Sequence, residues 1–296
     1  MTDSWLWALF TVIAAASQTV RNATQRGLTA TLGTAGATHV RFLFGLPFAI
    51  VFLALVMGAG AETLPLPPAI FWAWVLDGAL AQIAATALML AAMNDRSFVV
   101  VYAYIKTEPV QAALFGLVFL GDAVTVPMAA AILVATAGVV ITALKPGATL
   151  GLRATLLGLG AGGMFALSAV GFRGAILSLG LANYLMAATF TLVVGLVIQC
   201  VLLSLYLRLR EPQVMRAIVH HWRPSLVAGF MGALASQFWF LAFALATAAS
   251  VRTLALVEVL FAQAISYVVF KQTTTRREVA GIVLIVMGVG LLVWTY

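Results

Sequence analysis

The chain has 296 residues, of which 64% are hydrophobic and 8% charged, and its formal net charge is +7. A soluble domain of this size carries about a quarter charged residues. The composition therefore excludes a protein with a charged, water-facing surface and indicates one surrounded by lipid. The positive charge does not indicate a nucleic-acid partner, because the Lys and Arg residues lie between apolar runs and form no basic face.

The apolar runs are long enough to be membrane-spanning helices, which need roughly 20 residues to cross about 30 Å of hydrocarbon. The first run begins at Trp5 with no basic segment before it, so we interpret it as a span and not as a signal peptide. No sizeable soluble domain fits between the runs, and the longest polar connection is 208–223. We expect ten spans, at about Trp5–Gln25, Ala37–Met57, Ala69–Met93, Phe98–Leu120, Pro127–Leu144, Thr155–Leu177, Asn183–Leu205, Ser225–Thr247, Ser250–Phe270 and Val279–Trp294.

Two prolines, Pro47 and Pro109, lie inside expected spans. Proline has no N–H to donate within a helix, so it leaves a carbonyl without its usual partner and favours a kink. We therefore predict irregular backbone in the second and fourth spans.

The chain matches itself when it is shifted by 150 residues. Glu108 then meets Glu258, which is informative because the chain has only five Glu residues. Gly45 meets Gly195 in the same register, although matches among apolar residues are weak evidence in so apolar a chain. We therefore expect residues 1–150 and 151–296 to be two repeats of five helices each, which together form one transmembrane domain.

An odd number of spans in each repeat requires the two repeats to enter the membrane with opposite orientation. Inverted repeats are the plan of many secondary transporters, whose substrate sites lie near the midplane where the repeats meet. The predicted fold is thus an all-α membrane protein of ten helices in two inverted five-helix repeats. The repeat could instead record only an ancient duplication, and we prefer transport.

Basic residues are distributed unequally between the two sides of the predicted topology. Thirteen of the 16 Lys and Arg residues lie on or near the odd-numbered loops, and Arg173 and Arg252 lie on the other side. The positive-inside rule then predicts cytoplasmic odd loops and termini outside the cytoplasm.

Short motifs resemble the drug/metabolite transporter superfamily, in particular its ten-span EamA-type permeases. The second expected span reads HVRFLF over 39–44, similar to that family's Arg-Phe-Leu element, and the fourth reads YIKTEPVQAA over 104–113, followed by Leu-Gly-Asp at 120–122. Asp122 stands where the family ends this motif in Glu. The resemblance implies export of amino acids, other metabolites or drugs across a bacterial inner membrane, often by proton coupling. It also implies cytoplasmic termini, opposite to the charge count.

Three charged residues fall close to the middles of their spans: Lys106, Glu108 and Glu258. A charge in mid-membrane costs about 2.5–3.5 kcal/mol on insertion scales and usually faces a partner or water. We expect the three to border a central cavity, with Lys106 holding a carboxylate and a glutamate holding an amine or a proton. Lys106 is roughly 200° from Glu108 around the helix, so we expect it to reach across to Glu258 or into the cavity, while Glu108 points elsewhere. The alternative is a buried pair that only fixes helix register.

Several other residues are weaker candidates for substrate contact. Gln18, Asn22 and Gln25 share one face of the first span, which could line a water path or be a fraying helix end. Aromatic residues could stack on an apolar or aromatic substrate but are commonly core. The further candidates are Gln82, Gln111, Gln263, Phe165 and Trp239.

The sequence gives little support for an enzyme. It has three His residues with no Cys or carboxylate at metal-ligand spacing, no phosphate-cradling loop and no nucleophile elbow. We expect no cofactor and no metal. The expected function is secondary transport of a small-molecule substrate, with export of amino acids, including aromatic or other apolar ones, as the first choice. A passive channel, or an exchanger of drugs or sugar phosphates, is the alternative. The sequence leaves the oligomeric state open.

Overall fold

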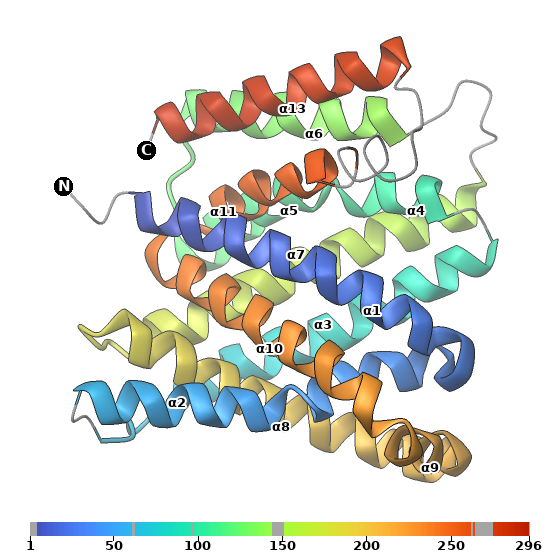
Figure 1. The fold of residues 1–296 in the computed structure, drawn as a ribbon. Helices are drawn as coiled ribbons and strands as arrows, with labels where there is room; N and C mark the ends of the chain where they lie inside the picture. The colour runs from blue at the N-terminus through green and yellow to red at the C-terminus, as the bar shows by residue number, and fades with distance from the viewer. Residues whose placement is uncertain are drawn as a thin grey trace. The chain divides into compact units, whose positions relative to one another are not determined.

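The fold is helical throughout the part of the chain that the structure describes, which is residues 5–60, 63–95, 98–143, 151–261, 263 and 275–295 of a computed structural model (Figure 1). No strand occurs in these ranges. The helices are α1 Leu6–Leu43, α2 Leu46–Gly60, α3 Ala69–Asp95, α4 Phe98–Ile105, α5 Glu108–Phe115, a π-helical turn Gly116–Leu120, α6 Val126–Ala143, α7 Leu152–Ser178, α8 Tyr184–Arg210, α9 Pro212–His220, α10 Trp222–Leu245, α11 Ala248–Leu254, a 3-10 turn Ala255–Val257 and α13 Arg276–Trp294.

Seven stretches of the described chain are long and apolar enough to cross a membrane. They coincide within a few residues with seven of the ten expected spans, which confirms the prediction of a multi-pass membrane protein. The stretches are Ala35–Gly60, Ala69–Ala92, Val126–Ala143, Leu152–Ser178, Tyr184–Arg210, Ser225–Leu245 and Arg276–Trp294.

The other three expected spans are helical but less regular. The first lies within α1, where Gln18, Arg21 and Asn22 interrupt the apolar run. The fourth is divided into α4, α5 and the π-helical turn. The ninth starts with α11, passes through the 3-10 turn and is helical again at 258–261, and most of its remainder lies outside the described residues. The first span is thus continuous helix with polar residues in it, and α1 bends only later, at Gly33, whereas the other two spans are interrupted in their backbone.

Helix breaks occur where the prolines predict them. The α4 helix ends at Ile105, four residues before Pro109, and α1 ends at Leu43, four residues before Pro47. A proline cannot donate to the carbonyl four residues earlier, so the helical ladder stops at that carbonyl. The prediction of irregular backbone in the second and fourth spans is confirmed.

The helices form two compact units. Unit 1 consists of Met1–Val12, Ala81–Val170 and Ala246–Tyr296, and unit 2 of Ile13–Leu80 and Gly171–Leu245. Each unit takes residues from both halves of the sequence. The predicted repeats 1–150 and 151–296 are defined by similarity of sequence, so they need not coincide with the compact units. The division into repeats stays a prediction.

Within unit 1, α6 and α13 pack closely and run antiparallel (Figure 1). A Cβ added at Gly138 would lie 2.6 Å from the Gly281 carbonyl oxygen, and one at Gly288 would lie 2.7 Å from that of Ala131. The two contacts are related by the 150-residue shift, which carries 138 to 288 and 131 to 281. Small residues therefore let the two backbones touch at corresponding points.

In unit 2, the α2, α8 and α10 helices pack against one another. Gly78 and Gly195 make room for the ring of Phe172, because a Cβ at either position would lie 2.9 Å from a ring carbon. The same ring lies 4.7 Å from that of Phe240, measured between centroids. The core of unit 2 is therefore built from aromatic rings that fit against glycines.

Candidate functional site

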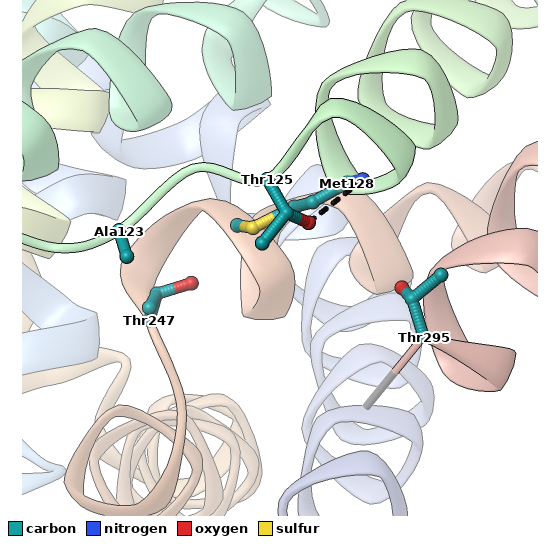
Figure 2. Close-up of a pocket in the computed structure, with 5 residues that line it drawn as sticks. All are labelled: Ala123, Thr125, Met128, Thr247 and Thr295. Atoms are coloured by element: carbon teal, nitrogen blue, oxygen red, sulfur yellow. Dashed lines mark hydrogen bonds between the residues drawn. The ribbon is translucent and has the colours of Figure 1, made fainter.

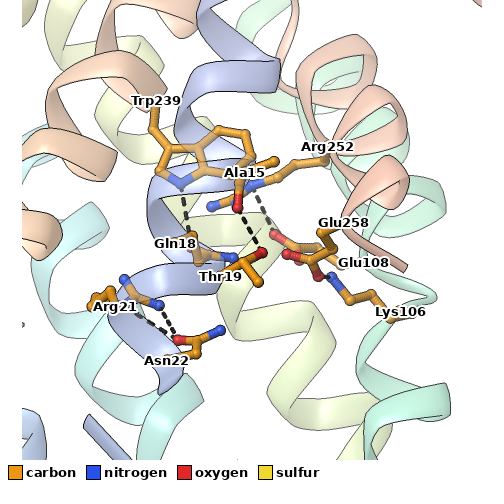
Figure 3. A network of polar contacts seen from close by, with 10 residues as sticks. All are labelled: Ala15, Gln18, Thr19, Arg21, Asn22, Lys106, Glu108, Trp239, Arg252 and Glu258. Atoms are coloured by element: carbon orange, nitrogen blue, oxygen red, sulfur yellow. Dashed lines mark hydrogen bonds and ion pairs between the residues drawn. The ribbon is translucent and has the colours of Figure 1, made fainter. Parts of the chain in front are cut away.

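The side chains of Lys106 and Glu258 form a buried ion pair in unit 1 (Figure 3). Lys106 follows the last residue of α4, and Glu258 follows the 3-10 turn that ends at Val257. Only 10% of the lysine side chain and 5% of the glutamate side chain are exposed. The contact with Glu258 is one of the two expected positions for the Lys106 side chain, although its role in substrate binding stays a prediction.

A second ion pair joins the same two segments of the chain, but here the segment of Lys106 supplies the anion and the segment of Glu258 supplies the cation. Glu108 is the first residue of α5, and its Oε1 lies 2.9 Å from Nε of Arg252 on α11. The arginine side chain is 13% exposed and the glutamate side chain 10%. Glu108 therefore pairs with a different cation from Glu258, and that cation, Arg252, lies within the ninth expected span, Ser250–Phe270.

Broken helices hold both pairs. Between α4 and α5, the Thr107 hydroxyl donates to the Tyr104 carbonyl over 2.7 Å and closes the end of α4. Pro109 leaves the Ile105 carbonyl without its usual helical donor. Gly162 of α7 lies against that carbonyl oxygen, because a Cβ there would be 3.0 Å away. The break is thus a packed feature of unit 1, with Lys106 just before it and Glu108 at the start of the next helix.

The four charges balance, and their arrangement is almost two-fold symmetric. The carboxylates of Glu108 and Glu258 are related by the 150-residue shift, and each receives a cation from the other element. The shift carries Lys106 to position 256, whereas the actual cation, Arg252, lies one helical turn earlier. Two cations and two anions therefore meet without net charge in an apolar setting, where each pair depends strongly on its partner.

The other predicted candidates of unit 1 are partly buried or contact neighbouring residues of the protein. Gln111 of α5 donates to the Thr107 hydroxyl over 3.0 Å and, less closely, to the Leu159 carbonyl over 3.4 Å. Phe165 of α7 packs on the buried cluster that contains Ile105. Gln82 of α3 and Gln263 are both partly buried. Gln111 thus braces the helix break, while substrate contact by any of these residues stays a prediction.

Trp239, one of the predicted candidates for substrate contact, belongs to unit 2. Its indole Nε1 donates to Oε1 of Gln18 over 3.3 Å, and its ring stacks on Phe243 at 6.4 Å between centroids with 22° between planes (Figure 3). The side chain is buried. Gln18 thus carries one contact of the polar stripe expected on the first helix, whereas the side chain of Gln25 in that stripe lies outside the described residues.

Sequence reasoning missed two charged residues. Arg252 lies two residues after the start of the ninth expected span at Ser250, and it was counted only among the charges on one side of the topology. Its spacing of six residues from Glu258 was the available signal. Asp77 is the only charged residue in the span Ala69–Ala92. Its Oδ2 is buried against Gly171, where a Cβ would lie 2.6 Å away, and it has no hydrogen-bond partner among the described residues.

A pocket of about 250 Å³ in unit 1 is lined by none of the predicted site residues (Figure 2). The threonine hydroxyl groups that line it form hydrogen bonds with nearby backbone atoms. Thr125 accepts from the Met128 N–H over 3.4 Å, Thr247 accepts from the Ser250 N–H over 3.2 Å, and Thr295 donates to the Leu292 carbonyl over 2.8 Å. These threonines finish helix ends, so we assign the pocket no ligand. The described residues also contain no group of three His, Cys, Asp or Glu that could hold a metal ion.

The fold is shared with proteins of known structure. Twenty-seven chains of solved structures match. One of these, a protein with a crystal structure, superposes with a TM-score of 0.73 at 15% sequence identity, over 98% of this chain and 95% of its own. At this identity the likeness concerns the fold alone. The sequence matches no protein-family model and no curated protein.

Proposed function

We propose that the protein is a secondary transporter of the drug/metabolite type, which exports small metabolites, above all amino acids, across a bacterial inner membrane by alternating access. The observation that carries the proposal is the pair of buried, mutually linked ion pairs at breaks in two helices of a multi-pass membrane protein. Discontinuous helices with buried charges mark the substrate sites of secondary transporters.

The pattern of breaks supports the inverted-repeat part of the proposal. The chain breaks just before Glu108 and again just before Glu258, its counterpart after the 150-residue shift. The shift also carries α6 onto residues 276–293, which lie within α13. The two helices pack antiparallel through corresponding contacts. A two-fold axis perpendicular to both helices relates such contacts, and if both helices span the membrane this axis lies in the membrane plane.

Charge balance supports a zwitterionic substrate. Opening either ion pair in an apolar interior leaves two unpaired charges, at a cost of several kcal/mol. An amino acid offsets this cost, because its carboxylate can replace Glu258 at Lys106 while its ammonium group replaces Lys106 at Glu258. A singly charged substrate can pair with only one of the two exposed charges, Lys106 or Glu258. The site should therefore prefer molecules that carry both charges.

Transport in proteoliposomes by variants that still purify as monodisperse protein tests this role. Lys106→Met or Glu258→Gln alone should abolish transport, and each leaves one buried charge unpaired, at about 3–5 kcal/mol. The double variant Lys106→Met/Glu258→Gln restores charge balance, so it should regain stability without regaining transport. Arg276→Gln, an exposed position on α13, is the matched control and should transport normally. Wild-type transport by the stable double variant would show that the pair is structural.

A counterflow competition distinguishes the substrate class. An apolar amino acid should compete with a labelled amino acid, whereas its N-acetyl derivative, which lacks the cation, and its methyl ester, which lacks the anion, should compete poorly. Accumulation against a gradient would separate a coupled carrier from a passive channel. Equal competition by all three compounds would refute the charge-replacement argument without affecting the fold.

A further inference from the structure

The connection between α8 and α10 and the helix ends beside it carry exposed positive charge in unit 2. Four arginines occur between residues 206 and 223, against the single carboxylate of Glu211. All four side chains are exposed. We call Arg208, Arg210, Arg216 and Arg223 the arginine surface.

The position of the arginine surface in a membrane follows from its neighbours. Arg208 and Arg210 lie in the last turn of the span Tyr184–Arg210, and Arg223 lies two residues before the span Ser225–Leu245 begins. The connection must therefore lie at the level of the lipid headgroups, where Arg and Trp are common.

Much of the apolar surface of the α9 helix packs within the unit. Ile218 is fully buried, and Val214 packs on the same cluster as Leu32, Val40 and Leu207. Gly36 allows the close approach, since a Cβ there would lie 2.6 Å from a Val214 methyl carbon. The outer face of α9 carries exposed residues that include Arg216 and the apolar Val219, which is 68% exposed.

Exposed apolar side chains flank the arginines. Leu205 and Leu209 are 54% and 72% exposed, and they share one helix face with Arg208 at i, i+3 and i+4 spacing. Trp222 is 48% exposed, and the Arg223 guanidinium carbon lies 5.5 Å from its ring centroid. Cations beside exposed apolar groups match a molecule with an anionic head and an apolar tail.

We propose that the arginine surface is a binding site for anionic phospholipids. Arg216 and Arg223 contact the phosphate of the headgroup, while Leu205, Leu209 and Trp222 contact the glycerol region and the upper acyl chain. This site is independent of the proposed transport site, which lies in unit 1.

Native mass spectrometry of the purified full-length protein tests the proposal, with phosphatidylglycerol and phosphatidylcholine of identical acyl chains as probes. The wild type should retain phosphatidylglycerol preferentially. The variant Arg216→Gln/Arg223→Gln should bind it on the order of 25-fold more weakly, because each arginine near an anionic surface contributes about fivefold. Its weaker binding of phosphatidylcholine should not change.

The matched control is Arg153→Gln/Arg276→Gln, which removes the same charge from exposed positions on α7 and α13. It should bind like the wild type. Brominated phosphatidylglycerol should also quench tryptophan fluorescence more than brominated phosphatidylcholine, and Trp222→Phe should abolish that difference. Equal binding of the two lipids by the wild type would overturn the proposal, as would an equal loss in the control variant, since net charge alone would then explain the binding.

Discussion

The contact between α6 and α13 leads to a prediction about two glycines. Gly138→Ala places a Cβ 2.6 Å from the Gly281 carbonyl oxygen, and Gly288→Ala places one 2.5 Å from the Ala135 backbone nitrogen. Ordinary contact begins at 3.4 Å, so the two distances are 0.8 Å and 0.9 Å too short. The obstacles are backbone atoms, and the helices must therefore separate by nearly 1 Å.

The separation should destabilise each variant by about 1–3 kcal/mol, the usual range for overpacking. Gly290→Ala is the matched control, because it lies on α13 with nothing within 4 Å of the added Cβ. Alanine there can only gain helix propensity, up to about 1 kcal/mol. The double variant Gly138→Ala/Gly288→Ala should cost less than the sum of the single variants, since one separation relieves both clashes.

Chemical denaturation of the detergent-purified protein measures these differences in unfolding free energy. If Gly288→Ala is as stable as Gly290→Ala, the backbone contact between the helices is not as close as described, and the argument for corresponding contacts in the two repeats fails with it.

Two further predictions concern orientation and packing. The thirteen basic residues on one side of the expected topology predict that a reporter active only in the cytoplasm stays silent when fused after residue 296; a bright signal would instead support cytoplasmic termini. In unit 2, Gly171→Ala brings a Cβ within 2.7 Å of the Gly78 backbone nitrogen and should lower the thermal unfolding temperature. Gly160→Ala on the same helix meets nothing closer than 3.6 Å and should leave that temperature unchanged. Equal unfolding temperatures of the two variants would contradict the packing of α3 on α7.

Much of the fold could be predicted because hydropathy and proline act locally. Seven spans lie where the apolar runs place them. The ends of α4 and α1 are explained by Pro109 and Pro47, since each proline removes one donor at a known distance. The two compact units could not be predicted, because they depend on packing between segments far apart in the sequence.

The charged site was predictable only in part. Lys106 contacts Glu258, one of the two expected positions for its side chain. The helical spacing behind that expectation does not hold in the structure, because the chain is broken between α4 and α5. The partner of Glu108 was missed because Arg252 stands close to a short connection, where a loop charge and a buried one look alike in sequence. Asp77 carried a clear signal as the only charge in its span, yet its burial against Gly171 depends on a second helix that the local pattern does not specify.

The long sequence separation of the ion-pair partners has a consequence for biosynthesis. Lys106 and Glu258 are 152 residues apart. At roughly 5–20 residues per second, a ribosome needs about 8–30 s to make the intervening chain. During that time Lys106 and Glu108 lack the ion-pair partners that they have in the folded protein.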